Sequence, residues 1–99
     1  MLLKKFKCFG VDIDITPDNI MAEDIYSAVR LYGDILIKDM PAESYLMPTI
    51  ETYNGMIVGV IIPFANIGTE EEPVSYERQP IYICEEDDYV RLYIDIVGS

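Results

Sequence analysis

Apolar and polar residues alternate near the start of the chain, which predicts a β-strand from Phe9 to Ile15. Such alternation is typical of a strand that packs one face on the core and turns the other to water. The apolar face would carry the side chains of Phe9, Val11, Ile13 and Ile15. The residues before Phe9 break the alternation, so a bulge or bend is expected near Cys8.

The next segment has the pattern of an amphipathic helix. Thr16 can cap the free backbone N–H groups, and Pro17 fits the first helical position. Gly33 is expected to end the helix as its C-terminal cap. This is the one clear helix that the sequence predicts. Its apolar stripe has helical spacing and consists of Ile20, Met21, Ile25, Ala28, Val29 and Tyr32.

A short strand and a hairpin are predicted next. Ile35 to Ile37 form the short strand, and the residues from Asp39 to Ser44 have the chemistry of a loop. Met47 to Tyr53 and Met56 to Ile62 flank Asn54-Gly55, a dipeptide favoured in type I′ turns because both residues tolerate positive φ. These two segments should therefore pair as antiparallel strands.

The segment from Met56 to Ile62 shows no alternation, so it should lie inside the sheet with both faces covered. In so small a chain one helix can cover only one of those faces. The loop from Asp39 to Pro48 and tyrosine side chains would supply the second cover. Alternatively, the open face packs on a second copy of the chain, because large exposed apolar patches usually mark contacts.

The last third of the chain predicts a polar loop and another pair of strands. Residues 68–80 are polar and long enough to form a mobile or functional loop. Ile81 to Cys84 and Tyr89 to Val97 then read as strands on either side of an acidic turn. In the final strand the apolar residues alternate, at Val90, Leu92, Ile94 and Ile96.

These elements predict one α+β domain over residues 1–99, in the sequence order β-α-β-β-β-β-β. Its sheet would be small and mainly antiparallel, with one helix packed on one face. The composition agrees, since 51% of the residues are hydrophobic and 25% are charged, the balance of a chain that buries a core.

Charge changes the picture of possible partners. Eighteen acidic residues against seven basic ones give a formal net charge of −11, which repels the phosphates of nucleic acids and the headgroups of anionic membranes. We therefore expect no direct nucleic-acid or membrane binding. A basic protein partner would be attracted, although acidity also serves solubility alone.

Cys8 and Cys84 are the only cysteines, and both are expected to be buried, reduced thiols. Neighbouring terminal strands would bring them close enough for a disulfide bridge. The first residues lack the apolar core of a signal peptide, and the run from Met56 to Phe64 is too short to span a bilayer. These features predict a cytoplasmic protein.

Little in the sequence points to catalysis. There is no histidine, so the commonest general base and metal ligand is missing, and no glycine-rich phosphate loop is present. We expect no enzymatic activity, no catalytic residues and no cofactor or metal. A weaker hypothesis is a metal-dependent carboxylate cluster of Asp12, Asp14 and Asp95, against which stands the ordinary interpretation of an exposed polar sheet face.

The acidity is concentrated in two short segments, which between them hold seven of the 18 acidic residues. Tyrosines lie in or beside these segments and supply large, rigid contact surfaces with a polar tip. The predicted partner-binding residues are Glu70, Glu71, Glu72, Tyr76, Glu85, Glu86, Asp87, Asp88 and Tyr89. Tyr82 and Tyr93 also lie in or beside these segments. The presence of these tyrosines is explained equally well if they are ordinary half-buried residues of strands.

The leading hypothesis is therefore a non-enzymatic binding or inhibitor protein that presents acidic loops to a basic partner. The acidic loops would then imitate the phosphates of a nucleic acid. By this analogy the partner is a nucleic-acid-binding enzyme, which the protein blocks as a mimic of the kind that phages and other mobile elements encode. The alternative is a homo-oligomeric sheet protein with a small ligand in an inter-subunit pocket, suggested by the doubly apolar strand from Met56 to Ile62.

Overall fold

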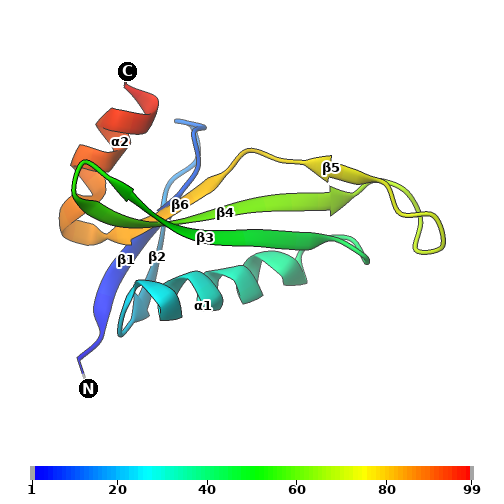
Figure 1. Ribbon diagram of the computed structural model, residues 1–99, viewed down its shortest axis with the longest axis horizontal. Helices are drawn as coiled ribbons and strands as arrows, with labels where there is room; N and C mark the ends of the chain where they lie inside the picture. The colour runs from blue at the N-terminus through cyan, green and yellow to red at the C-terminus, as the bar shows by residue number, and fades with distance from the viewer. Residues whose placement is uncertain (1, 99) are drawn as a thin grey trace.

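A computed structural model of the chain, which describes residues 2–98, has a six-stranded antiparallel sheet with a helix on each face (Figure 1). The α+β class, the antiparallel sheet and a helix packed on one face are thus confirmed. The elements in chain order are β1 (Lys4–Phe9), β2 (Asp18–Ala22), α1 (Ile25–Lys38), β3 (Tyr45–Tyr53), β4 (Met56–Asn66), β5 (Ser75–Glu77), β6 (Ile81–Glu85), a 3₁₀ turn η1 (Glu86–Asp88) and α2 (Tyr89–Val97).

Strand β4 is the long central strand of the sheet. The strand order is β2-β1-β6-β4-β3, and β5 pairs with the far end of β4 along the same side as β6. Between the pairs Ile61↔Ile81 and Phe64↔Glu77, two residues of β4 lie opposite the three residues that connect β5 to β6, so the ladder carries a one-residue bulge. Pro63 lies at this bulge, where a missing N–H costs no regular ladder bond.

The β3–β4 hairpin forms as the sequence predicts. Tyr53 pairs with Met56 across a two-residue turn, and Asn54 (φ 50°) and Gly55 (φ 82°) both adopt the positive φ that a type I′ turn requires. The predicted loop from Asp39 to Ser44 is also present, and β6 extends the predicted strand from Ile81 by one residue. In these segments the local sequence strongly favours one structure, and the folded protein adopts it.

The sheet separates two hydrophobic cores. The core under α1 contains Phe6, Cys8, Ala22, Ala28, Val29, Tyr32, Ile61 and Ile83. The core under α2 contains Phe9, Met56, Val58, Val60, Cys84 and Leu92. Because β4 contributes to both, the prediction that both of its faces are covered is confirmed, and α2 supplies much of the second cover.

Of the alternating segment from Phe9 to Ile15, only Phe9 belongs to a strand and residues 10–15 form a loop, so the predicted first strand is wrong. β1 ends at Phe9, runs through Cys8 without a bulge, and pairs with β2 on one side and β6 on the other. Ile13 and Ile15 are exposed. The alternation could not reveal that the chain must reverse here to place β2 beside β1.

Helix α1 begins later and ends later than predicted. Its N-cap is Asp24, whose Oδ1 accepts a 2.8 Å hydrogen bond from the backbone N–H of Ser27. This hydrogen bond lowers the pKa of the Asp24 carboxyl. Gly33 lies inside the helix, and Ile35 to Ile37 continue it, so the predicted cap and short strand are wrong. Thr16-Pro17 instead precedes β2, whose pairing with β1 outweighs the local capping signal.

The predicted last strand is helix α2. In a helix the alternate residues diverge around the axis, and the exposed fractions follow this rule: Leu92 0%, Val90 66% and Ile94 58%. The acidic residues of η1 precede α2 and suit the positive end of its dipole. None of the helices in residues 2–98 is long and apolar enough to cross a membrane.

Candidate functional site

The two acidic segments lie at opposite ends of the molecule, whose longest extent is 43 Å (Figure 1). Residues 70–72 lie in the loop that joins β4 to β5, and residues 85–88 lie where β6 passes into α2. The fold therefore does not bring the nine predicted partner-binding residues onto one continuous surface.

The acidic segment 85–88 is largely paired within the chain. Lys4 Nζ lies 3.7 Å from Glu85 Oε1, Lys5 Nζ lies 3.4 Å from Glu86 Oε2, and an Arg91 nitrogen lies 3.5 Å from Asp88 Oδ1. These side chains are partly exposed, so each pair adds little stability. Their main effect is to reduce the negative charge that this end displays.

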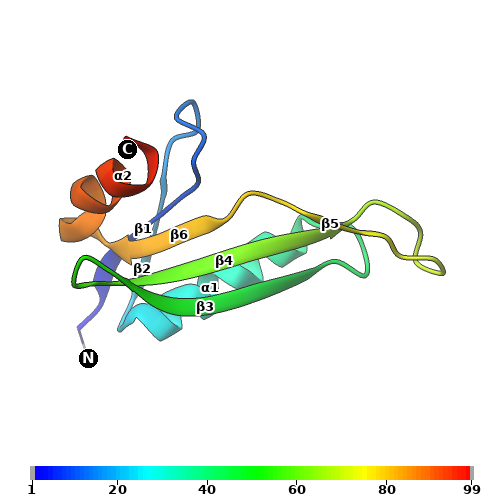
Figure 2. The ribbon, with the colours of Figure 1, turned by 45° about the horizontal axis from the view of Figure 1, so that its top comes forward.

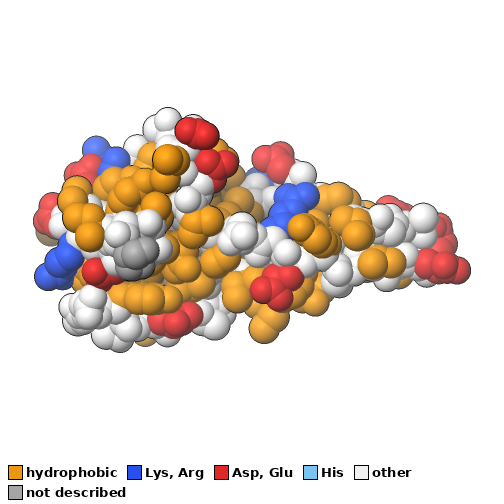
Figure 3. Space-filling view, turned by 90° about the horizontal axis from the view of Figure 1, so that it is seen from above, with side chains coloured by type: hydrophobic (Ala, Val, Ile, Leu, Met, Phe, Trp, Pro, Cys, Tyr) orange, Lys and Arg blue, Asp and Glu red, His pale blue; other side chains and the backbone are white. Residues whose placement is uncertain are grey.

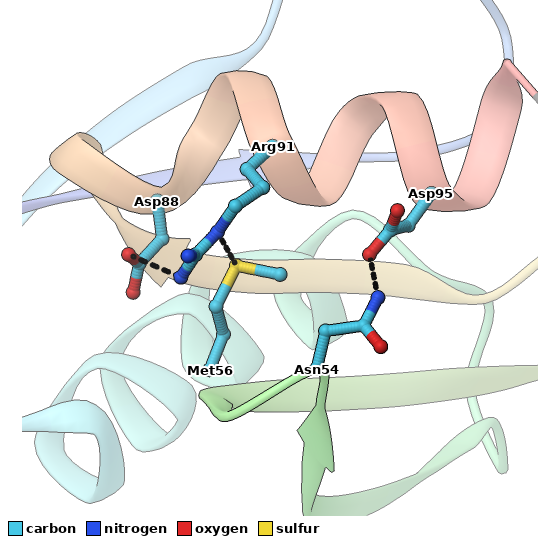
Figure 4. A network of polar contacts seen from close by, with 5 residues as sticks. All are labelled: Asn54, Met56, Asp88, Arg91 and Asp95. Atoms are coloured by element: carbon cyan, nitrogen blue, oxygen red, sulfur yellow. Dashed lines mark hydrogen bonds and ion pairs between the residues drawn. The ribbon is translucent and has the colours of Figure 1, made fainter.

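Arg91 also ties the acidic segment to the hairpin below it (Figure 4). Its Nε donates a hydrogen bond to Met56 Sδ at 3.3 Å, while its guanidinium holds Asp88. One helical turn further on, the Asn54 side-chain amide donates to Asp95 Oδ2. Residues 88–95 therefore serve to fix α2 over the β3–β4 turn.

A projecting arm carries the other acidic segment. We define the distal arm as residues 64–77, formed by the end of β4, the loop 67–74 and β5 (Figures 1 and 2). No ion pair within residues 2–98 involves Glu70, Glu71 or Glu72. Figure 3 shows carboxylates gathered at the end of the arm and apolar side chains along it. Unlike segment 85–88, the arm thus displays its charge.

Asn66 organises the base of the arm, a role for which no sequence pattern offers a signal. It is 5% exposed, and its Oδ1 accepts hydrogen bonds from the backbone N–H groups of Gly68 and Val74, both at 2.9 Å. Its Nδ2 donates to the carbonyl oxygens of Ala42 and Thr69. One buried amide thus closes the loop 67–74 and joins it to the loop before β3.

Gly68 allows the loop to close tightly. A Cβ atom at this position would lie 2.4 Å from the carbonyl oxygen of Glu72, too close for any side chain. Thr69 reinforces the same turn, because its Oγ1 accepts a hydrogen bond from the Glu72 N–H at 2.9 Å. The acidic tip is therefore held in a defined shape by the residues on either side of it.

The tyrosines near the acidic segments differ in role. Tyr89 packs edge-on against Phe9 at 5.1 Å between ring centroids, and Lys7 Nζ lies 5.6 Å from its ring. Tyr82 and Tyr93 complete this aromatic cluster under α2. Burial raises the pKa of Tyr82 and of Tyr89. Tyr76, on the arm, is 57% exposed and free to contact a partner.

The carboxylate cluster proposed for Asp12, Asp14 and Asp95 depended on two strands that do not exist. Asp12 and Asp14 lie in the loop between β1 and β2, where Asp12 Oδ1 accepts a hydrogen bond from the Asp14 N–H. Asp95 lies on α2 and is held by Asn54. Residues 2–98 contain no group of three potential metal ligands.

The two cysteines are buried free thiols, as expected. Their strands are neighbours, but Cys8 pairs with Ile83 and Cys84 with Lys7, so the side chains point to opposite faces of the sheet. Cys8 lies in the core under α1 and Cys84 in the core under α2. Burial raises the pKa of both thiols to about 12, and the sheet itself prevents a bridge between them.

Two hollows border α1. One, of about 780 Å³, lies between the loop after β1, the C-terminal half of α1 and the connection from β5 to β6. The other, of about 680 Å³, is a groove between α1 and the edge strand β3. Both fall in the size range of small-molecule sites.

Comparisons with protein-family models, with curated proteins and with solved structures find no match for this chain. The arrangement of its own residues is therefore the basis for inferring function.

Proposed function

We propose that this chain is a non-enzymatic binding protein that presents the acidic tip of its distal arm to a basic surface of a partner protein. The observation that carries the proposal is the contrast between the two acidic segments. Segment 85–88 is paired with lysines and an arginine, whereas residues 70–72 have no ion pair within the described chain. Unpaired charge on a projecting, ordered loop is well placed to steer and orient a basic partner.

The arm also offers apolar contact area. Ile67, Val74 and Tyr76 are all exposed on it. Aromatic and aliphatic anchors beside charged residues are the usual composition of a protein interface. The acidic residues would set the rate and orientation of binding, while these side chains would supply most of the buried surface.

Segment 85–88 and Tyr89 would also contact the partner if the partner's basic surface extends along the long axis of this protein. A groove that normally holds a nucleic acid has this form, because phosphate charges repeat along the whole duplex. A nucleic-acid-binding enzyme, inhibited by a charge mimic, is therefore the partner class that we favour. Competition between this protein and duplex DNA for a captured partner distinguishes it from other basic proteins.

Neutralising the acidic tip of the arm is expected to weaken strongly the capture of basic proteins at low salt. Tagged wild-type protein and the E70Q/E71Q/E72Q variant are compared for the basic proteins that each retains from lysate at low and high salt. We expect at least a tenfold loss for the variant, the scale on which steering by local charge acts. The wild-type retention should also fall at high salt.

The matched control is E85Q/E86Q/D87N, which also removes three negative charges but from the opposite end of the molecule. It should retain most of the binding. Equal losses in the two variants would indicate a response to net charge alone and contradict a role for the arm. If the wild-type protein retains no basic protein at low salt, the proposal is wrong.

A second candidate function rests on the part of the sheet that α2 leaves open. Tyr45 stacks on Phe64, with ring centroids 4.9 Å apart, and the neighbouring Met47 is 50% exposed. This half of the face lies beyond α2 (Figure 1). A second copy packed here would enclose a pocket for a small ligand, as the alternative hypothesis requires.

Sedimentation tests the second candidate. The charge of −11 on each copy opposes association, so the measurement is made at high salt, where that repulsion is screened. A dimer that M47D converts to a monomer would support this function. A wild-type protein that stays monomeric at every concentration, even at high salt, removes it.

A further inference from the structure

The larger hollow beside α1 has an apolar wall. Tyr76 and Glu77, at the base of the distal arm, line part of it, whereas none of the acidic residues 70–72 does. Its volume of about 780 Å³ is ample for a small organic molecule or a long side chain. The wall is formed by Val11, Ile15, Ile35, Leu36, Pro63 and Ile81. A ligand with an apolar body would therefore be accommodated here by burial of its hydrocarbon part.

One polar group in the wall is fixed in place. Asp18, at the start of β2, accepts a 2.6 Å hydrogen bond on Oδ2 from the hydroxyl of Tyr32. Tyr32 belongs to the core under α1, and burial and the nearby Asp18 raise its pKa, so its hydroxyl stays protonated and continues to donate. The carboxylate of Asp18 is thus anchored by a rigid neighbour, and Oδ1 has no protein partner within hydrogen-bond distance among the described residues.

The remaining charges around the hollow favour a cation. Asp12, Asp39 and Glu77 line it together with Asp18, and Arg78 is the only cationic side chain in its lining. Four carboxylates against one guanidinium would repel an anion and attract a positive group. An apolar wall with one anchored carboxylate is the arrangement that holds an amphiphilic cation, because each end of the ligand meets a matching surface.

We propose that this hollow binds an organic cation, namely an ammonium or guanidinium group carried on an apolar stem, with Asp18 as its counter-ion. Free amines and the lysine or arginine side chains of a partner protein share this chemistry. The acidic residues 70–72 take no part in this site, so either proposal can fail while the other holds.

Three probes that share a phenethyl-type skeleton test the role of charge. The probes are phenethylamine, 2-phenylethanol and phenylacetate, each titrated into ¹⁵N-labelled full-length protein while amide shifts are followed by NMR. We expect the amine to shift the amides of Cys8, Asp18, Tyr32 and Ile35 with an affinity at least tenfold above that of the alcohol. Phenylacetate should give no saturable response. Equal responses to amine and alcohol, or no shift at these residues up to about 10 mM amine, overturn the proposal.

A pair of variants tests Asp18 itself. D18N keeps an oxygen that can accept the Tyr32 hydroxyl while removing the charge, and it should reduce the affinity for phenethylamine to that for 2-phenylethanol. D34N is the control, because Asp34 is an exposed residue of α1 that lines the other groove. Unchanged amine affinity in D18N, or an equal loss in D34N, contradicts the assignment. The wild-type probe series remains decisive if D18N fails to fold.

The source of the cation is distinguished by two further ligands. N-acetyl-lysine methylamide and N-acetyl-arginine methylamide carry the same groups on a peptide backbone. Binding of these at least as tight as that of phenethylamine identifies a partner's side chain as the natural occupant. Exclusion of both, with phenethylamine still bound, identifies a free amine.

Discussion

Replacing Leu92 with alanine is expected to lower the free energy of unfolding by about 3–4 kcal/mol, the cost of a large cavity in a core. Leu92 is fully buried at the centre of the contact between α2 and the sheet. The surrounding core contains four aromatic rings whose packing depends on the position of α2. Urea denaturation followed by tyrosine fluorescence measures the change.

The control for this prediction is Ile94→Ala on the same helix. Ile94 points to solvent, so its truncation should change stability by less than about 0.5 kcal/mol. In a strand, residues 92 and 94 would share one face and both substitutions would be costly. Similar losses for the two variants would therefore contradict the helical assignment of residues 89–97.

Replacing Gly59 with alanine is expected to cost about 2–3 kcal/mol, because this glycine is the point of closest approach between β4 and α1. An added Cβ would lie 2.3 Å from Cγ2 of Val29. Valine in a helix has one strongly preferred rotamer, so the clash cannot be relieved by rotation of its side chain. The helix must move away from the sheet and open the core beneath it.

A double-mutant cycle identifies the clash as the cause. Val29→Ala alone should cost about 2 kcal/mol as a cavity. In G59A/V29A the new methyl group occupies the vacated space, so the double variant should be more stable than the sum of the single effects by about 1–2 kcal/mol. Additive effects would refute this account. Gly10→Ala is the control, since its Cβ would meet only Pro80 O, at 3.8 Å.

Leu92→Ala and Gly59→Ala test opposite faces of one sheet, and neither residue belongs to the distal arm. Asn66 holds the arm together through hydrogen bonds to the loop 67–74 and to Ala42. Partner binding through residues 70–72 should therefore survive in any variant of α2 that still folds. This separation lets stability and binding be measured independently.

Local patterns predicted the parts of the fold whose geometry is set by neighbouring residues. Asn54-Gly55 fixed the turn of the β3–β4 hairpin, because few other dipeptides accept two positive φ angles. The apolar run of β4 indicated a strand covered on both faces. The stripe formed by Ile25, Ala28, Val29 and Tyr32 located most of α1, although its ends were misplaced.

In two segments, alternation of apolar residues predicted a strand that the fold does not contain. The segment from Phe9 to Ile15 has the period of a strand, yet the chain after Phe9 crosses from β1 to β2, and Ile13 and Ile15 are exposed. Tyr89–Val97 has the same period, yet it forms a helix that covers the second face of the sheet. A short alternating segment is compatible with several structures, and the choice depends on which uncovered surface lies nearby.

The candidate site was predicted in part. The sequence located the concentrated acidity and the tyrosines, but it could not distinguish the paired segment 85–88 from the unpaired residues 70–72. That distinction depends on Lys4 and Lys5, which lie about eighty residues away along the chain and beside segment 85–88 in the fold. The hollow at Asp18 likewise combines residues from four segments that are distant along the chain.

The sequence by itself determined the α+β class, the central hairpin, the absence of histidine chemistry and the two places where negative charge is concentrated. These properties follow from composition and from contacts between near neighbours. Only the tertiary structure decided that Cys8 and Cys84 face opposite cores, that α2 is a helix and that Asn66 shapes an arm with an unpaired acidic tip. Each of these depends on contacts between distant segments, whose free energy outweighs the small local preferences that a sequence displays.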